Sequence, residues 1–174
     1  MTRIEEGRMQ IRQSAELVDE VIKEALKHTG QSRTGRTIKV EEEDELILAK
    51  MDARLIVQVL INLIGNAVKY TPQGTDITVR VKKEKAENAE RSQVIISVCD
   101  LGNGIPDDRK ERVFDMFYTG SDQVADSRRS LGLGLGLCRS IINAHGGKIW
   151  ISDNIPHGAV VTFTLPAEEV ALNE

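Results

Sequence analysis

Apolar residues recur with the period of an α-helix in three parts of the chain. Residues 15–28 carry them on one side, which predicts an amphipathic helix. A second helix is predicted to follow Asp52, a good N-cap residue, and to end near Tyr70, before Pro72. A third helix is predicted over residues 133–144 and should end at the glycines that follow them.

Alternating or continuous apolar runs predict the strands of a sheet. These runs occupy residues 37–41, 46–50, 77–82, 94–100, 148–152 and 160–165. Trp150 and Phe163 alternate inward in the last two, so we expect both in the core. The order of elements predicts a two-layer α/β sandwich, with a mixed, mostly antiparallel sheet and helices on one face.

Three connections lack long apolar periodicity. Residues 84–92 are charged and are expected to form a hairpin loop between two strands. Residues 106–114 begin with proline and are expected to form a short helix. Residues 118–131 are polar, with glycine, serines and two adjacent arginines, and are predicted to form a mobile loop.

Composition narrows the class of protein. The chain has 174 residues, 40% of them hydrophobic and 29% charged, as in one soluble globular domain. A net charge of -4 does not favour nucleic acid or an anionic membrane surface. The sequence has no apolar run of transmembrane length and no signal peptide. Cys99 and Cys138 lie among apolar residues and are expected to be buried free thiols, which together indicates a cytoplasmic domain.

The second predicted helix has a polar side that suits a metal-bound phosphate. At about 100° per residue, Asn62, Asn66 and Lys69 fall within an arc of roughly 60°. A neutral amide oxygen suits Mg²⁺, which takes its remaining ligands from water and phosphates, and a lysine offers charge to phosphate oxygens. A helix with two polar surface amides is an equally good interpretation of this pattern alone. The opposite side is expected to face the core through Leu60, Leu63, Ile64 and Ala67.

Two glycine-rich segments follow. Asp100 ends a buried strand, where a carboxylate needs a hydrogen-bond donor such as an adenine amine, and Gly102 and Gly104 would allow close backbone approach. Alternatively, Asp100 caps its own turn. The glycines at 132–136 precede the third helix, and backbone N–H groups at a helix start bind anions. A flexible hinge is the alternative for that segment.

Four segments resemble the conserved boxes of sensor histidine kinases. The run Asn-Leu-Ile-Gly-Asn-Ala-Val-Lys-Tyr-Thr at 62–71 resembles the N box, and Asp-Leu-Gly-Asn-Gly-Ile at 100–105 resembles the G1 box. Val-Phe-Asp-Met-Phe-Tyr at 113–118 is similar to the F box, and Gly-Leu-Gly-Leu-Gly-Leu at 132–137 to the G2 box. The resemblance covers nearly the whole chain from about residue 10. The run from Met51 further resembles the potassium-responsive Kdp-type sensor kinases.

The resemblance implies the Bergerat ATP-binding fold shared with gyrase, Hsp90 and MutL proteins, with ATP and Mg²⁺ as cofactors. It implies that Asn66 is the principal metal ligand, and that Asn62, Asn66 and Lys69 are the catalytic residues. Asp100 would hold the adenine amine, and Tyr70 would lie along the nucleotide. The remaining ATP-binding residues implied are Gly102, Gly104, Ile105, Phe114, Arg128, Arg129, Gly132, Leu133, Gly134, Leu135, Gly136 and Leu137. From its pattern alone, Phe114 is expected in the core.

The resemblance also implies a division of the chain. Residues 1–8 resemble the end of a dimerisation helix, 9–168 would be the catalytic domain, 118–131 its ATP lid, and 169–174 a tail. The phosphoacceptor motif is missing, since none of the three histidines is followed by an acidic residue. We therefore expect the histidine to lie on another domain of a longer, membrane-anchored parent protein. A response regulator would be the later acceptor, and the isolated domain should be a monomer.

One departure from the family pattern bears on the phosphates. A basic residue usually follows the F-box aromatics, but Thr119 stands there, so Arg128 or Arg129 would have to substitute. Three alternatives to histidine phosphorylation stay open. They are a gyrase-type ATP hydrolase, an anti-sigma-type serine kinase and a nucleotide-binding module without catalysis. Hydrolysis is disfavoured because Asn62 occupies the position where those hydrolases carry a glutamate base.

Overall fold

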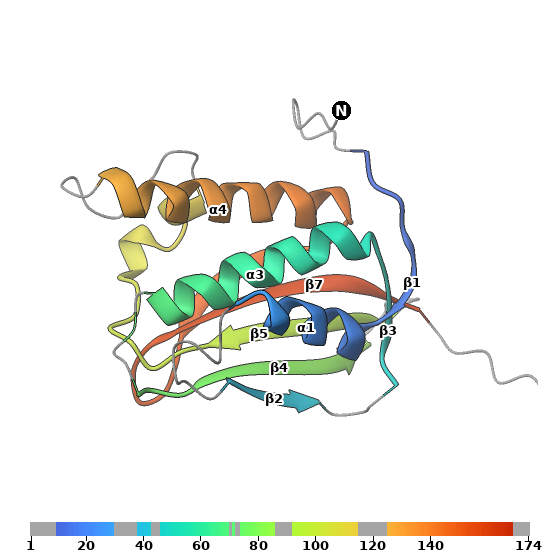
Figure 1. The fold of residues 1–174 in the computed structure, drawn as a ribbon, viewed down its shortest axis with the longest axis horizontal. Coiled ribbons are helices and arrows are strands. Elements are labelled where there is room, and N and C mark those ends of the chain that lie inside the picture. The colour runs from blue at the N-terminus through green and yellow to red at the C-terminus, as the bar shows by residue number, and fades with distance from the viewer. Residues whose placement is uncertain are drawn as a thin grey trace, which may run out of the picture.

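The computed structural model contains a seven-stranded sheet with its helices on one face (Figure 1). The structure describes residues 10–29, 38–42, 46–69, 71, 74–85, 92–114 and 125–168, with only the backbone described for 125–133. Helices α1 (Val18–Lys27), α3 (Ala53–Lys69) and α4 (Ala125–Ala144) form the second layer. Two 3-10 turns, η2 (Asp107–Arg109) and η3 (Arg112–Phe114), lead towards α4.

The sheet is mixed and mostly antiparallel, as predicted. Its order is β1-β3-β7-β5-β4-β2, and β6 also pairs with β7. Among the strands of the described residues, only β2 and β4 pair in parallel. The strands are β1 (Ser14–Leu17), β2 (Ile38–Glu42), β3 (Leu48–Met51), β4 (Ile77–Glu84), β5 (Gln93–Cys99), β6 (Ile149–Asp153) and β7 (Ala159–Glu168).

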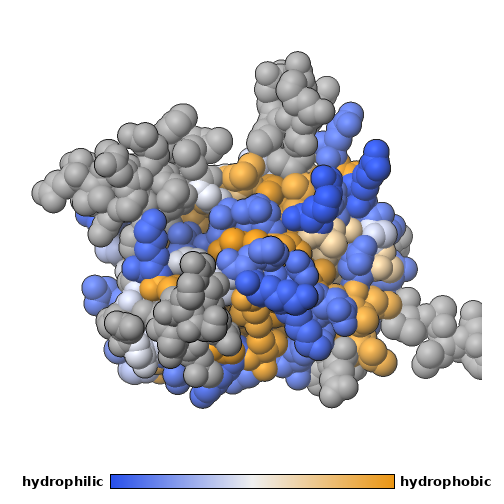
Figure 2. All heavy atoms as spheres, in the orientation of Figure 1, coloured by the Kyte–Doolittle hydropathy of each residue, from blue (hydrophilic) through white to orange (hydrophobic). Residues whose placement is uncertain are grey.

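The core lies between the inner face of the sheet and the apolar sides of the three helices. On α3, the positions predicted to face the core are all buried, from Leu60 to Ala67. Phe163 of β7 is fully buried beneath the helices, as predicted. On α1 the outer side carries charged residues, including the ion pair of Lys23 with Asp19, and Figure 2 shows this hydrophilic side next to strips of apolar surface. The amphipathic pattern thus places each helix on the sheet.

Trp150 does not face the core, so that prediction is wrong. Its side chain is 40% exposed, whereas Ile149 and Ile151 are 6% and 7% exposed. Side chains alternate between the two faces of a strand, and in β6 the two isoleucines take the helix-covered face. The tryptophan therefore lies on the opposite face of the sheet, next to Thr162 of β7.

Two predicted boundaries also differ from the structure. Residues 14–17 form strand β1 rather than the first turn of the helix, because they pair with β3 and backbone hydrogen bonds to the sheet outweigh local helical periodicity. Helix α4 begins at Ala125, so the part of the predicted lid from 125 to 131 has helical backbone. None of the residues in that part is a proline, so the helix can extend towards the N-terminus from the apolar turns that pack on α3. The predicted terminal segment 1–8 and the tail 169–174 lie outside the described residues.

The start of α3 is joined to the end of α4 by a buried histidine. His145 is 3% exposed, its Nδ1–H donates to the Ile141 carbonyl at 2.7 Å, and its Nε2 accepts the backbone N–H of Asp52 at 3.0 Å. Burial holds the pKa of His145 below its usual 6.5. The imidazole is therefore neutral and carries its proton on Nδ1.

Asp52 precedes α3, as predicted, and it also holds the incoming chain. Its carboxylate accepts the backbone N–H of Arg12 at 3.1 Å and the guanidinium of Arg54 at 3.0 Å. Burial raises the pKa of Asp52, but the hydrogen bonds from Arg54 and Arg12 outweigh it, so its pKa lies below 3.8. The carboxylate is therefore ionised near neutral pH.

Candidate functional site

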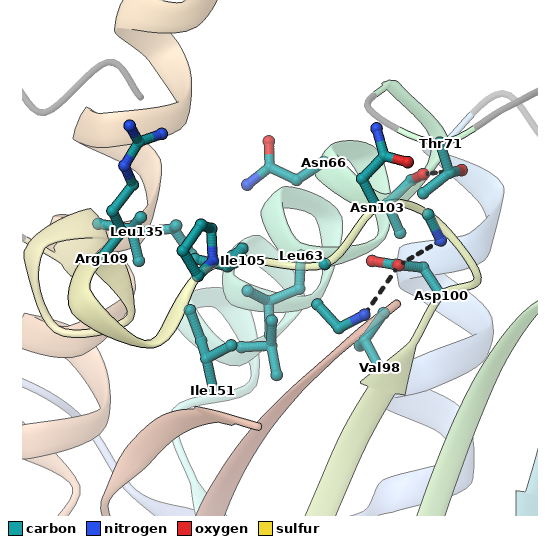
Figure 3. A pocket seen from close by; sticks show the side chains of 17 residues that line it. Leu63, Asn66, Thr71, Val98, Asp100, Asn103, Ile105, Arg109, Leu135 and Ile151 are labelled. Atoms are coloured by element: carbon teal, nitrogen blue, oxygen red, sulfur yellow. Dashed lines mark hydrogen bonds between the residues drawn. The ribbon is translucent and has the colours of Figure 1, made fainter. Parts of the chain in front are cut away.

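A cavity of about 300 Å³ lies between α3, the loop after β5, and the ends of β6 and β7. Its walls are mainly apolar, and Figure 3 shows Leu63 and Ile151 facing one another across it. Polar groups line its edge at Asn66, Asp100 and Arg109. An apolar slot with a few convergent polar groups is the usual form of a small-molecule site.

Asp100 borders this cavity, and backbone groups hold its carboxylate. Its Oδ1 accepts the N–H of Gly102 at 2.9 Å and the N–H of Ala159 at 3.1 Å (Figure 3). Within the described part of the chain, the structure gives its Oδ2 no hydrogen-bond partner. The carboxylate thus caps its own turn with one oxygen, as one of the two interpretations predicted, and retains the other as an acceptor for a ligand.

The two asparagines of α3 have different surroundings. Asn66 lines the cavity and points across its mouth (Figure 3). Asn62, one helical turn earlier, is directed at α4, where its Nδ2 lies 3.7 Å from the Sγ of Cys138. Lys69 is exposed at the end of α3 and is not a lining residue. Only Asn66 of the three predicted catalytic residues therefore borders the cavity.

The first glycine segment forms the cavity edge, as expected. Gly102, Gly104 and Ile105 all line the cavity. A Cβ on Gly102 would lie 2.7 Å from Cγ2 of Thr71, and Gly104 has φ +79°, a conformation that side chains rarely adopt. Gly102 thus permits the close approach of this loop to Thr71, and Gly104 permits its positive φ.

The second glycine segment was predicted to precede a helix, but it lies inside α4. In an α-helix the backbone N–H groups at 132–136 are directed to carbonyls four residues earlier, so they are not the free donors of a helix start. Leu135 is buried and lines the cavity, and Gly134 packs beside Asn62, with a Cβ there lying 3.5 Å from the amide carbon. Gly136 is buried and Leu137 half-buried against the core.

Of the remaining predicted ligands, one lies away from the cavity, and the structure does not describe the side chains of the others. Phe114 is 4% exposed in the core, with the Arg139 guanidinium 4.6 Å from its ring centroid, and it is not a lining residue. Its neighbour Val113 borders the cavity instead. Tyr70 lies outside the described residues. The same is true of the side chains of Arg128, Arg129 and Leu133, and Gly132 is described by its helical backbone alone.

The structure adds lining residues that the sequence did not single out. Thr71, Asn103 and Arg109 border the cavity. Asn103 stands between the two loop glycines, and that position in the motif could have indicated that it borders the site. Arg109 is exposed on η2, and within the described residues no ion pair involves it. No periodic pattern distinguishes such an arginine from an ordinary surface residue.

Both cysteines are buried free thiols, as predicted. Burial raises the pKa of Cys138 to about 12, against a smaller opposing effect of the Asn62 amide. Burial also raises the pKa of Cys99. Both groups are therefore protonated at neutral pH, which excludes a thiolate nucleophile.

Comparison with known families agrees with this geometry. A family model described as histidine kinase-, DNA gyrase B-, and HSP90-like ATPase matches residues 51–169. The chain belongs to this ATPase family. The matched region contains α3 and the loop after β5, which together form the site. Membership in the family confirms the predicted family and the ATP-binding role of the domain.

Curated relatives in this ATPase family include two kinds of sensor kinase. The sensor protein KdpD of Clostridium acetobutylicum is 39% identical over 168 residues, which are 97% of this chain and 18% of that protein. The adaptive-response sensory kinase SasA of Gloeothece citriformis is 36% identical over 145 residues, or 82% of this chain and 35% of that protein. The predicted resemblance to Kdp-type kinases is thus supported. The chain spans less than half the length of these relatives.

Solved structures of the family confirm the fold. The catalytic domain of histidine kinase ThkA superimposes with a TM-score of 0.73 and 31% identity, over 90% of this chain and 96% of that domain. ThkA in complex with the response regulator TrrA gives a TM-score of 0.71 and 30% identity, over 90% of this chain and 42% of that one. The mycobacterial kinase MprB, at 22% identity, shares the fold with a TM-score of 0.74.

Proposed function

We propose that this chain is the catalytic domain of a sensor histidine kinase, and that it transfers the γ-phosphate of ATP to a histidine on a separate dimerisation domain. The observation that carries the proposal is the cavity that Asp100 and Asn66 both line. The names of the KdpD, SasA and ThkA relatives support it.

Adenine recognition would rest on Asp100. A carboxylate only accepts hydrogen bonds, and its Oδ2 is the oxygen left available by the two backbone donors. The exocyclic amine of adenine would donate to it, and the apolar walls would enclose the ring. Guanine presents a carbonyl oxygen at that position, which would face the carboxylate and be disfavoured.

The residues present are compatible with Mg²⁺ at the cavity mouth. Asn66 offers a neutral amide oxygen, a hard ligand that suits this ion and does not repel the phosphates beside it. No cluster of three or more His, Cys, Asp or Glu side chains that could hold a metal occurs in the described residues, so phosphate and water would supply most of the coordination. When bound, the ion would neutralise charge on the transferred phosphoryl group.

The chain's own part in transfer would be to position and protect ATP. The imidazole nitrogen of the acceptor histidine forms the new bond to phosphorus, the bond to the β-phosphate oxygen breaks, and ADP leaves. We propose that Lys69, Arg128 and Arg129 contact the phosphates and that Tyr70 lies along the nucleotide. Arg109 is a further candidate, because its guanidinium borders the cavity near Leu135 (Figure 3).

The surroundings of Asn62 oppose hydrolysis. A carboxamide does not accept a proton from water as a glutamate would, and Asn62 contacts Cys138 of α4 rather than lining the cavity. The site therefore provides ATP binding without a base for water. We propose that phosphate leaves the nucleotide only when the acceptor histidine is present.

The partners would be the histidine-bearing domain of the same parent protein and a response regulator, as in the complex of ThkA with TrrA. We propose a cytoplasmic location, where ATP and reduced cysteines are found. Within the part of the chain that the structure describes, no helix is both long and apolar enough to cross a membrane.

Labelled ATP, a separately produced histidine domain and the Asp100→Asn variant test the proposal. Asparagine keeps an Oδ1 acceptor for Gly102 and Ala159 but replaces Oδ2 by an amino group, so the fold should persist. Loss of a hydrogen bond to a charged group should weaken ATP binding by about 10- to 100-fold. The matched control is Asp108→Asn on the exposed surface of η2, which should bind ATP normally.

Label on the histidine domain that depends on Asp100 supports the kinase. ATP binding that depends on Asp100 without any label on histidine would instead identify a binding module. Steady release of phosphate by the chain alone would identify a hydrolase. Equal ATP affinity in the Asp100→Asn variant and the wild type would mean that the adenine lies elsewhere.

A further inference from the structure

The turn between β6 and β7 reaches over the Asp100 loop and holds its backbone. Asn154 Nδ2 donates to the carbonyl of Asp100 at 2.7 Å. His157 Nδ1 lies 2.8 Å from the carbonyl of Gly102, and because a carbonyl only accepts, this nitrogen carries the proton. Two side chains of one turn thus anchor the two carbonyls that flank Leu101.

Backbone contacts from the same turn reach the Asp100 side chain itself. The N–H of Ala159 donates to Asp100 Oδ1 at 3.1 Å, and the N–H of Asp100 donates to the Ala159 carbonyl at 2.9 Å. Gly158 packs so closely that a Cβ on it would lie 2.0 Å from the Asp100 carbonyl oxygen. The turn therefore sets both the position of the loop and the direction of the carboxylate.

A lysine extends this anchoring to the far end of the loop. Lys110 Nζ donates to the carbonyl of Ile105 at 2.7 Å and pairs with Asp153 at 2.9 Å and with Asp107 at 2.5 Å. Its side chain is only 16% exposed. Because Asp153 is the last residue of β6, the loop is tied to the β6–β7 hairpin at Asp100, Gly102 and Ile105.

We propose that the β6–β7 turn, residues 153–158, sets adenine selectivity, with Asn154 and His157 as positioning residues that act through Asp100. This inference rests on the proposed function, in which Asp100 accepts the adenine amine. The nucleotide need not touch either side chain. Fixed carbonyls at Asp100 and Gly102 hold the free Oδ2 in one direction, and a preorganised acceptor loses less entropy on binding.

Inosine triphosphate distinguishes binding through Asp100 from binding through the sugar and phosphates. Inosine triphosphate carries a carbonyl oxygen where ATP carries the amine, and otherwise presents the same sugar and phosphates. Loosening the turn should weaken the binding of ATP, which uses Asp100, and leave the affinity for inosine triphosphate unchanged. A contribution to stability alone would not change the ratio of the two affinities.

Titration of the whole chain with ATP and with inosine triphosphate measures this ratio. Each variant loses one neutral hydrogen bond. We expect the ratio of the ATP affinity to the inosine triphosphate affinity to fall about 3-fold in His157→Leu, because the His157 side chain is exposed. In Asn154→Asp we expect it to fall about 10-fold, because the Asn154 side chain is half-buried. The new carboxylate at 154 repels both triphosphates equally, so the ratio isolates the lost donor. His157→Asn should restore the ratio, because the asparagine Nδ2 occupies the place of the imidazole Nδ1.

Ile155→Ala is the matched control in the same turn, since Ile155 is 88% exposed, and its ratio should equal that of the wild type. An unchanged ratio in folded His157→Leu would overturn the positioning role. If Asn154→Asp does not fold, the exposed His157 variants decide the question by themselves.

Asp100→Asn separates the two proposals. If this variant keeps the wild-type ratio, the adenine site is misplaced and both proposals fail. If it abolishes the preference for ATP while the Asn154 and His157 variants keep it, the adenine site stands and the positioning role alone is wrong.

Discussion

The two glycine-rich segments of this chain differ in backbone structure and in neighbours. Gly102 and Gly104 lie in the irregular loop between β5 and η2, whereas the glycines at 132–136 lie inside helix α4. In the first segment, a Cβ on Gly102 would lie 2.7 Å from Thr71 Cγ2, and a Cβ on Gly104 would lie 3.1 Å from the Gly158 carbonyl oxygen. Around Gly134 an added Cβ would meet Asn62 at an ordinary 3.5 Å.

The comparison shows that glycine has opposite energetic effects at the two places. In the loop it permits a conformation and a close approach that other residues cannot make. In the helix it costs conformational entropy without a compensating contact, roughly 1 kcal/mol relative to alanine. Alanine substitutions should therefore destabilise the loop and stabilise α4.

The largest effect is expected for Gly158→Ala, in the turn that closes over the Asp100 loop. The new Cβ would overlap the Asp100 carbonyl oxygen, and the residue has φ +114°. We expect the free energy of unfolding to fall by about 3–4 kcal/mol, measured by urea denaturation. Gly74 has a similar φ, +93°, but open space where a Cβ would lie. The free energy of unfolding should therefore fall clearly less in Gly74→Ala. Equal losses would mean that the contact is absent in solution.

Gly104→Ala should have a smaller effect of the same sign. Its φ of +79° is unfavourable for alanine, and the Cβ would lie 3.1 Å from the Gly158 carbonyl oxygen. We expect a loss of about 1–2 kcal/mol in the free energy of unfolding. Gly146 has φ +81° and nothing nearby, so the difference between the two alanine variants measures the crowding alone.

Gly134→Ala should raise the free energy of unfolding by about 0.5–1 kcal/mol, because α4 gains a better helix former. Gly65→Ala, in α3 with nothing within 4 Å, is the reference for a helical glycine and should give a similar gain. Thermal unfolding of both variants checks this. A stability loss confined to Gly134→Ala would contradict the helical assignment of the second glycine segment.

The smallest effect concerns the other end of α4, where His145 is held neutral. Because its folded pKa lies below its unfolded value of about 6.5, its contribution to stability is complete above that pH and is lost as pH falls through the folded pKa. Unfolding should therefore become easier between pH 7.5 and 5.5. His145→Gln should reduce this pH dependence, which urea denaturation at a series of pH values measures.

Local patterns were enough to predict most of the fold. Alternation located all strands except β1, and helical periodicity placed α3 and its buried side correctly. The errors at residues 14–17 and at Trp150 have one cause. The edge on which a strand pairs, and the face that helices cover, depend on partners far along the chain, and local periodicity does not specify them.

Part of the cavity lining was predictable from sequence motifs. Asp100, Gly102, Gly104, Ile105 and Asn66 line the cavity, as expected from their motifs. Phe114 does not line the cavity. Its sequence pattern does not distinguish an aromatic ligand residue from a core residue.

Asn154 and His157 were not predicted, since they contact residues 54 and 55 positions away in the sequence. No short motif encodes such contacts. The anchoring of the Asp100 loop therefore became visible only in the structure.

The burial of Cys138 gives the domain an intrinsic chemical probe. This thiol lies between α3 and α4, fully buried, with a pKa of about 12. Alkylating reagents react with the thiolate, so labelling of Cys138 requires α4 to separate from α3. The labelling rate in excess reagent would then report how often the two helices part, and comparison with and without ATP would show whether the nucleotide slows that opening.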